Sequence, residues 1–190
     1  MDTYRIGSGD GEIEAVYHGQ GSGPYVFLCH GFGSDKEGSH RERADFLAEN
    51  GFSAVRFDFR GNGGSTGEFT EQTLSSRVED LVSVVEYFEP EDYALFGSSF
   101  GAKVVYFSLE GLRPELVTVK SPALLDRVMD PYRARVERSG ASSFFPGRGL
   151  GAIWLTNWIP TALGSVMGPF LSSCFREPTT CSSPRSTPGR

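Results

Sequence analysis

A serine between two glycines is the first feature of this sequence that could perform chemistry. Residues 97–101 read G-S-S-F-G, which fits the G-x-S-x-G pattern with Ser99 in the middle. The apolar run 93–96 before it is typical of a buried strand, and residues 100–109 after it carry apolar side chains at helical spacing. A nucleophilic serine raised above a sheet needs this order of strand, sharp turn and helix. A plain strand-to-helix connection would show the same pattern, so the pentapeptide alone leaves both interpretations open.

The turn that carries Ser99 must be tight, which restricts its neighbours. A serine held there in strained backbone leaves no room for bulk two residues before or two residues after it. Gly97 and Gly101 meet this requirement, and Ala102 would let the helix pack close to the strand.

Strand-like and helix-like segments alternate around this turn. Two strands joined by a glycine-rich turn open the chain, and later strands alternate with amphipathic helices. The predicted strands are residues 3–6, 13–18, 25–29, 54–57, 93–96 and 116–120, and the predicted helices are residues 39–50, 73–88 and 100–109. This order predicts an α/β fold whose sheet is parallel apart from its antiparallel N-terminal strands.

Length and composition narrow the classes of function. The 190 residues suffice for one domain with a real core, and the net charge of −6 argues against nucleic acid or an anionic membrane as partner. No signal peptide is visible, and no apolar stretch reaches the roughly 18 residues of a membrane span. The three cysteines, Cys29, Cys174 and Cys181, lack metal-ligand spacing, and Cys29 is expected in the core. We therefore expect a cytoplasmic protein with no metal and no cofactor.

Two glycine motifs resemble nucleotide-binding loops, but each fails at a required position. Gly61 and Gly63 follow a strand as in a dinucleotide fingerprint, yet Thr66 stands where the third glycine belongs. Residues 97–103 resemble a phosphate loop, which needs Gly-Lys followed by Ser or Thr, whereas residues 102–104 read A-K-V. Neither motif predicts a phosphate site.

Four features in the right order point to a known superfamily. They are the antiparallel start, H-G at 30–31 after one strand, D-F-R-G-N-G-G-S at 58–65 after the next, and the serine turn. Together they resemble the α/β-hydrolase superfamily, and in particular its small esterase, monoglyceride-lipase and serine-aminopeptidase-like branch. The resemblance covers residues 4–145. It implies an α/β-hydrolase fold, flanked by helices, and a small-molecule ester or amide as substrate.

The resemblance also implies roles for individual residues. Ser99 would be the nucleophile, and the backbone N–H groups of Phe32 and Phe100 would form the oxyanion hole. His30 would brace the oxyanion loop and not act as the base. Asn62 stands where many relatives carry histidine. A serine at position 99, where dehalogenases and epoxide hydrolases carry aspartate, argues against those two chemistries. The positions implied to be structural are His30, Gly31, Asp58, Arg60, Gly61, Gly97 and Gly101.

The catalytic base is missing from its expected place. In this fold the triad runs Ser, then Asp or Glu, then His, but His18, His30 and His40 all precede Ser99. We expect His18 and His40 to be solvated or locally hydrogen-bonded, and Asp126 to be either the acid or a helix-surface residue. Because a serine hydroxyl without a base is a poor nucleophile, two functions stay open. One is an impaired serine hydrolase of small carboxylic esters or amides, and the other is a non-catalytic hydrolase-fold remnant or binding module.

The composition changes near residue 147. Residues 147–190 hold only one of the 24 acidic residues, Glu177, but both tryptophans, Trp154 and Trp158. We therefore divide the chain into a hydrolase core, 1–146, and an atypical tail, 147–190, which is either read out of frame or a divergent segment that packs as a cap. The out-of-frame interpretation implies that C-terminal strands of the fold are missing. It also leaves an open edge at the strand 116–120, through which copies of the chain could associate.

Overall fold

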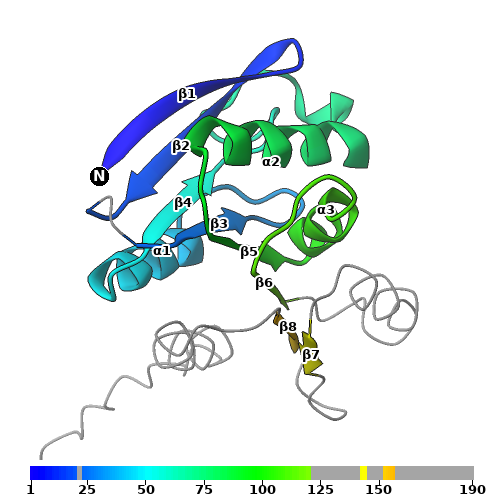
Figure 1. The fold of residues 1–190 in the computed structure, drawn as a ribbon. Helices are drawn as coiled ribbons and strands as arrows, with labels where there is room; N and C mark the ends of the chain where they lie inside the picture. Colours follow the sequence, from blue (N-terminus) through cyan, green and yellow to red (C-terminus); the bar gives the residue numbers. More distant parts are fainter. Residues whose placement is uncertain (21–22, 121–141, 145–151, 157–190) are drawn as a thin grey trace, which may run out of the picture.

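A single sheet organises the computed structural model, which describes residues 1–20, 23–120, 142–144 and 152–156. Its eight strands follow the order β1-β2-β4-β3-β5-β6-β8-β7 (Figure 1). The strands are β1 (Asp2–Ser8), β2 (Gly11–His18), β3 (Tyr25–Cys29), β4 (Ser53–Phe57), β5 (Tyr93–Ser98), β6 (Leu116–Lys120), β7 (Ser142–Phe144) and β8 (Ala152–Thr156). The helices are α1 (Ser39–Glu49), α2 (Leu74–Phe88) and α3 (Phe100–Ser108), with a short 3₁₀ turn η1 (Phe69–Glu71).

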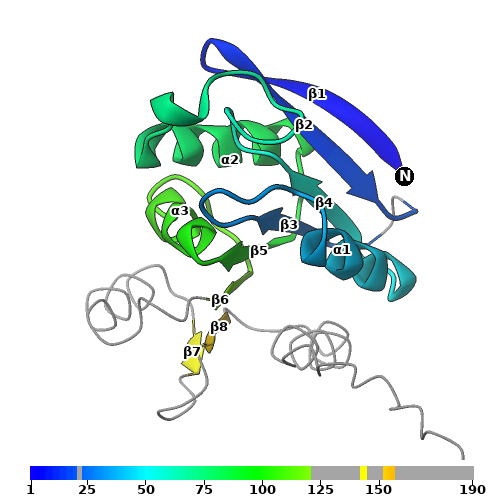
Figure 2. The same ribbon diagram turned by 180° about the vertical axis from the view of Figure 1, so that it is seen from behind.

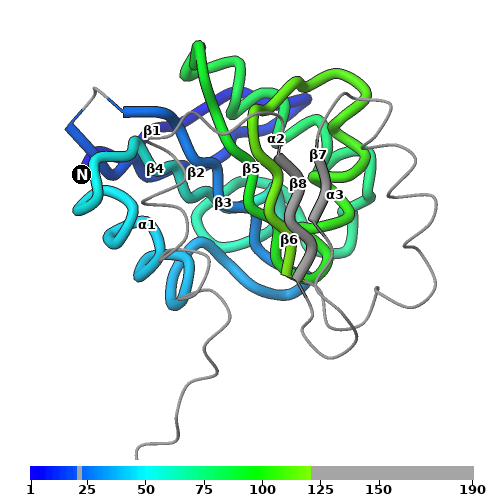
Figure 3. The backbone as a smooth tube through the Cα atoms, turned by 60° about the horizontal axis from the view of Figure 1, so that its bottom comes forward, coloured from blue at the N-terminus to red at the C-terminus, as the bar shows by residue number. Residues whose placement is uncertain are grey.

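The middle of the sheet is parallel and its N-terminal part is antiparallel. Strand β3 pairs in parallel with β4 and β5, and β5 pairs in parallel with β6, so four parallel strands run side by side (Figure 3). Strand β2 is antiparallel to both β1 and β4. The predicted α/β fold with antiparallel N-terminal strands is confirmed.

Helices cover both faces of the sheet, with α2 and α3 on one side and α1 on the other (Figures 1 and 2). Strand β3 shows why both faces need cover, because successive side chains of a strand point to opposite faces. Phe27 and Cys29 belong to the apolar cluster under α2 and α3, whereas Val26 and Leu28 belong to the cluster under α1. The continuous apolar run of this strand therefore forms two cores at once, and Cys29 is the expected core residue.

The helix ends follow local sequence signals. Helix α1 ends at Glu49, and Gly51 behind it has a φ of +86°, a conformation that favours glycine. Helix α2 begins with a capping box, in which the Thr73 hydroxyl accepts from the Ser76 amide and the Ser76 hydroxyl accepts from the Thr73 amide. These two signals fix where the helices start and stop between the strands.

Strand β6 is paired on both of its sides. It runs parallel to β5, and it is antiparallel to β8 over all five residues, from Leu116 opposite Thr156 to Lys120 opposite Ala152. The open edge expected at residues 116–120 is therefore wrong for the described sheet. The proposed boundary after residue 146 falls between β7 and β8, which pair with each other. Asp126, Trp158, Cys174, Glu177 and Cys181 lie outside the described residues.

Candidate active site

Ser99 sits at the sharpest backbone turn of the candidate site. It follows β5 directly and precedes the first residue of α3, with φ 52° and ψ −114°. A non-glycine residue with such dihedrals stores of the order of 1–3 kcal/mol of strain, and the surroundings must hold it in place. The Ser99 amide donates to the Lys120 carbonyl at the end of β6, at 2.6 Å, and the Ser99 carbonyl accepts from the Ala102 amide at 3.1 Å. The side chain is left exposed above the carboxyl ends of the parallel strands.

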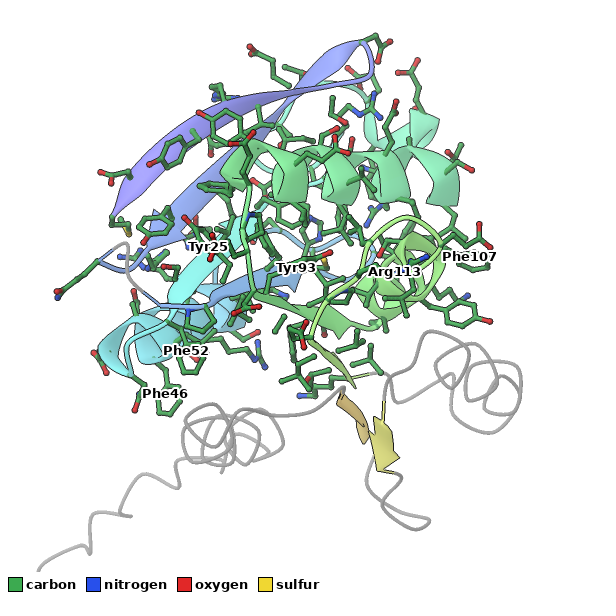
Figure 4. All side chains as sticks on the ribbon, viewed as in Figure 1. Tyr25, Phe46, Phe52, Tyr93, Phe107 and Arg113 are labelled. Atoms are coloured by element: carbon green, nitrogen blue, oxygen red, sulfur yellow. The ribbon has the colours of Figure 1, made fainter. Side chains whose placement is uncertain are left out.

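The connection between α3 and β6 is held by a hydrogen bond at the other end of β5 from Ser99. The Tyr93 hydroxyl, at the start of β5, accepts from the Arg113 amide in the loop after α3, at 2.9 Å (Figure 4). The loop is thereby joined to β5 before the chain enters β6. Because β6 carries Lys120, this bond supports the register that places the Lys120 carbonyl beside the serine turn.

The two glycines around Ser99 allow strand, turn and helix to touch. A Cβ atom on Gly97 would lie 2.7 Å from the Ala102 Cα, which is closer than real Cβ contacts allow. On Gly101 it would lie 2.6 Å from the His30 carbonyl oxygen and would also collide with the carbonyl oxygen of Cys29. Gly97 thus lets α3 approach its own strand, and Gly101 lets α3 approach the end of β3.

The loop after β3 lies against the serine. A Cβ atom on Gly31 would be 3.2 Å from the Ser99 Cβ and 3.8 Å from its hydroxyl oxygen. The next residue, Phe32, has 63% of its surface exposed, and its ring centre lies 5.9 Å from that of Phe100. Phe100 is the first residue of α3, so its amide has no acceptor within that helix. The two residues implied in an oxyanion hole therefore lie side by side next to Ser99.

His30 is fixed by hydrogen bonds on both ring nitrogens. Its Nε2 accepts from the Phe59 amide at 3.2 Å, so its Nδ1 carries the proton and donates to the Gly31 carbonyl at 2.8 Å. Complete burial lowers the pKa of this histidine from 6.5 to about 4. A neutral imidazole with both nitrogens occupied can brace the loop 31–34 but cannot take a proton from Ser99.

The other two histidines are buried as well. His18 lies between the Asp45 carboxylate, 2.9 Å from Nδ1, and the Arg56 guanidinium, whose Nε donates to Nε2 at 2.8 Å. Burial is the largest cause that lowers its pKa, followed by Arg56. Of the two alternatives expected for His18, solvated or locally hydrogen-bonded, the structure shows the second.

His40 is buried and not solvated. Only 4% of its surface is exposed, and its ring packs edge-on against Phe96, with ring centres 6.0 Å apart. Its Nδ1 has no hydrogen-bond partner, and burial lowers its pKa to about 3. The expectation of a solvated His40 is wrong, because the first turn of α1 packs down onto the sheet above β5.

Asp58 ties together the two loops that border the site. Its buried carboxylate accepts from the Lys36 amide and ammonium, both at 2.6 Å, and from the Gly64 amide at 2.8 Å. Lys36 belongs to the loop after β3, and Gly64 belongs to the turn after β4. Within this turn Gly61 has a φ of 75°, and a Cβ atom there would lie 2.7 Å from the Glu68 carbonyl oxygen. The D-x-R-G-x-G-x-S segment is therefore a structural connector in this chain.

Arg60 attaches the same turn to α2. Its Nε donates to Asp80 Oδ1 at 2.6 Å and its amide donates to Asp80 Oδ2 at 2.9 Å, while the Ser8 hydroxyl also donates to Asp80 at 2.8 Å. Glu79 adds an exposed contact to the guanidinium at 2.5 Å. One buried carboxylate thus joins β1, the turn 58–65 and α2.

Two buried cations next to the site, Lys36 and Arg77, were not predicted from the sequence. The burial of Arg77 could have been predicted from its spacing. It stands four residues before Leu81 and seven before Val84, so it lies on the same face of the helix as these two residues. Both of those residues are fully buried, and so is Arg77, with 1% of its surface exposed. Lys36 gives no comparable signal, since it lies in an irregular loop.

The described part of the chain has neither a cluster of potential metal ligands nor a helix that could span a membrane. No group of three or more histidine, cysteine, aspartate or glutamate side chains gathers there as potential metal ligands. Nor does any helix in that part combine the length and apolarity needed to cross a bilayer.

Solved structures that share this arrangement of strands and helices are α/β-hydrolases, which is the class that the fold defines. A putative hydrolase from Agrobacterium vitis superposes with a TM-score of 0.55 at 24% identity, over 82% of this chain and 67% of that one. A proline iminopeptidase-related protein from Thermus thermophilus gives a TM-score of 0.54 at 29% identity, over 61% of this chain and 42% of that one. The family described as serine aminopeptidase, S33, matches residues 22–124. The chain belongs to this family.

Two curated relatives are themselves described as uncharacterized. One, from Mycobacterium tuberculosis strain H37Rv, is 33% identical over 105 residues, which are 54% of this chain and 37% of that protein. The other, a 31.7 kDa protein from Escherichia coli, is 32% identical over 89 residues, or 44% of this chain and 31% of that protein. The chain thus spans well under half the length of these relatives.

Proposed function

We propose that this chain carries the nucleophile and the oxyanion hole of a serine hydrolase that acts on small carboxylic esters or amides. Ser99 Oγ attacks the carbonyl carbon, and the amides of Phe32 and Phe100 stabilise the oxygen that becomes negative. His30 and Gly31 hold the oxyanion loop, and Asp58, Arg60 and Gly61 hold the neighbouring turn. No cofactor takes part in this proposal.

The strained backbone of Ser99, pressed against the Gly31 loop, is the observation that carries the proposal. A φ of 52° at a serine is costly and persists only where the surroundings enforce it. Here the enforcing contacts come from three elements, β3, β6 and α3, which meet at this one residue. Such strain at an exposed serine favours a functional turn over a plain strand-to-helix connection.

The three histidines argue that the reaction is slow in the chain as it stands. His18 and His30 use both ring nitrogens in other hydrogen bonds, and His40 is buried against Phe96. Without a general base, the hydroxyl proton leaves only to solvent, and most of the rate enhancement of a serine hydrolase is lost. The second candidate function, a hydrolase-fold module that binds small molecules without turnover, is favoured by this observation alone.

Covalent labelling separates the two candidates. A fluorophosphonate probe is incubated with the chain, and the modified residue is identified by peptide mass spectrometry. We expect slow modification of Ser99, no modification in Ser99→Ala, and unchanged modification in the neighbouring variant Ser98→Ala. Absence of any label on Ser99 after prolonged incubation would favour the binding module.

A further inference from the structure

Arg77 lies directly behind the two residues that form the proposed oxyanion hole. Its guanidinium carbon is 5.8 Å from the ring centre of Phe32 and 5.2 Å from that of Phe100, and it also lies 4.9 Å from the ring of Phe59. Three aromatic rings thus surround a cation with 1% of its surface exposed. Attraction between a cation and ring faces grows when water is excluded, so this placement holds the two phenylalanines around a fixed charge.

No described carboxylate contacts the guanidinium of Arg77, although Asp80 acts on its charge from further away. Its hydrogen bonds go to neutral amide oxygens: Nε donates to Gln72 Oε1 at 3.0 Å, Nη2 donates to the same oxygen, and Nη2 also donates to Asn62 Oδ1 at 3.1 Å. The Nη1 atom is buried and has no partner. Among the described residues, no carboxylate lies within 4.0 Å of this guanidinium, and Arg60 takes the Asp80 oxygens nearby.

The other buried cations near the site are compensated. Lys36 contacts the carboxylates of Asp58 and Glu14 at 2.6 Å and 2.7 Å, and Arg56 contacts that of Glu37 at 2.6 Å. A buried charge without a counter-charge is costly to a fold. Of these three buried cations, Arg77 is therefore the one that no described carboxylate contacts directly.

We propose that Arg77 is a positioning residue of the Ser99 site, whose charge, with no described carboxylate in contact, stabilises the oxyanion through the amides of Phe32 and Phe100. This inference rests on the proposed function of Ser99. When Ser99 Oγ bonds to a carbonyl carbon, the π electron pair moves to the oxygen, which becomes negative, and the hydroxyl proton passes to water. A cation in water-excluded surroundings several ångströms away lowers the energy of that anion more than the energy of the neutral ester.

The decisive variant neutralises this charge without removing the arginine. Gln72→Glu places a carboxylate on Nε and Nη2 of Arg77, where the amide oxygen lies now. We expect the variant to melt at about the temperature of the parent, because the counter-ion gained by Arg77 offsets the lost hydrogen bond from Gln72 Nε2 to Asn62 Oδ1. We also expect its maximal rate of phosphonylation by the fluorophosphonate probe to fall about tenfold, with unchanged probe affinity. In that reaction the Oγ–P bond forms, the P–F bond breaks and fluoride leaves.

Two further variants complete the experiment. Arg77→Met removes the charge and should slow the reaction at least as much, whereas Arg77→Lys keeps a charge and should retain part of the rate. Gln20→Glu is the matched control, because Gln20 is exposed and follows β2 at the opposite end of the sheet, and it adds the same charge. It should change neither the rate nor the melting temperature.

The outcomes separate this inference from the function on which it rests. A parental rate in Gln72→Glu, or a rate that falls only together with the melting temperature, would overturn the inference and leave Ser99 as the nucleophile. If Arg77→Met does not fold, Gln72→Glu still decides. A parent chain whose Ser99 does not react at all would overturn both.

Discussion

At the scale of single residues, the turn at Ser99 depends on Gly97 and Gly101, where a Cβ atom would collide with nearby backbone. Gly101 is the most demanding of them, since two carbonyl groups of the β3 end occupy the space that a Cβ atom would need. Carbonyl oxygens of a central strand cannot move aside as the end of a flexible side chain could. The glycine is therefore required by the approach of α3 to β3, and not by its own backbone dihedrals.

Gly101→Val should consequently destabilise the chain by about 3 kcal/mol or more, because overpacking forces backbone shifts. Gly7→Val is the matched control: Gly7 lies in β1, and no atom lies within 4 Å of the position of its Cβ. Urea denaturation followed by circular dichroism measures both. If Gly101→Val is as stable as Gly7→Val, the close approach at the serine turn is not real.

His40 predicts a stability that depends on pH. Its folded pKa of about 3 and that of His30, about 4, lie below their ordinary value of 6.5. Both groups therefore take up a proton on unfolding, and the free energy of unfolding falls as pH falls below about 6.5, by about 1.4 kcal/mol per pH unit for each histidine.

Replacing His40 should reduce this dependence, to which His30 and the buried His18 continue to contribute. His40→Phe keeps an aromatic ring against Phe96 and removes one titrating group, so its free energy of unfolding should fall less steeply between about pH 6.5 and pH 4.5. Urea denaturation at several pH values measures the slope. Equal slopes for parent and variant would show that His40 titrates normally and is solvated after all.

At the scale of elements, the turn 58–65 is held by buried carboxylates rather than by its own hydrogen bonds alone. Glu79 and Asp80 both contact the Arg60 guanidinium, but the Glu79 side chain is 54% exposed and that of Asp80 is 1% exposed. The two residues are neighbours on α2 and offer a matched pair. Their contributions should differ because solvent screens one pair and not the other.

Asp80→Ala should lower the free energy of unfolding by about 3–5 kcal/mol. The substitution removes the Asp80 carboxylate to which the Arg60 amide, the Arg60 Nε and the Ser8 hydroxyl donate. Glu79→Ala should cost less than about 1 kcal/mol. Chemical denaturation of the two variants gives the comparison. Similar losses would mean that burial of the Asp80 contact does not matter to the fold.

The elements themselves could largely be predicted from the sequence. Strands β3 and β6 have the predicted bounds, β3 as a continuous apolar run and β6 as a short segment rich in β-branched residues. Helix α1 stops before Gly51, as its sequence indicates. The 3₁₀ turn η1 gave no signal, since three residues carry no periodicity. The need for glycine at positions 97 and 101 could also be predicted, because a tight strand-turn-helix connection leaves no room for side chains there.

The electrostatic surroundings of the site could not be predicted in the same way. The burial of His40 depends on where the first turn of α1 lands on Phe96, and the isolation of Arg77 depends on three rings from three different segments. Both are products of tertiary packing between residues distant in the chain. The pairing of β6 with β8 was likewise missed, because the composition change near residue 147 suggested that no strand would follow.

At the scale of the whole molecule, β8 covers the edge of β6 that would otherwise be open. Exposed strand edges are sites of association between chains. We therefore expect that Trp154→Pro combined with Leu155→Pro, which removes two adjacent amides opposite Thr118 and Val117, releases β6 and promotes self-association. Size-exclusion chromatography with light scattering compares parent and variant. An unchanged mass distribution would show that β8 does not protect β6.

The central claim is that Ser99 is a nucleophile in a prepared turn without a general base from this chain. A histidine base gives the rate an inflection near pH 7, whereas a hydroxyl that loses its proton to solvent reacts faster with every increase in pH. The most direct measurement is the rate of fluorophosphonate labelling of Ser99 between about pH 6 and pH 9. We predict a slow rate that rises throughout this range without a plateau and is absent in Ser99→Ala. A plateau above about pH 7, with rapid labelling of Ser99, would contradict the claim, because it would require a working base.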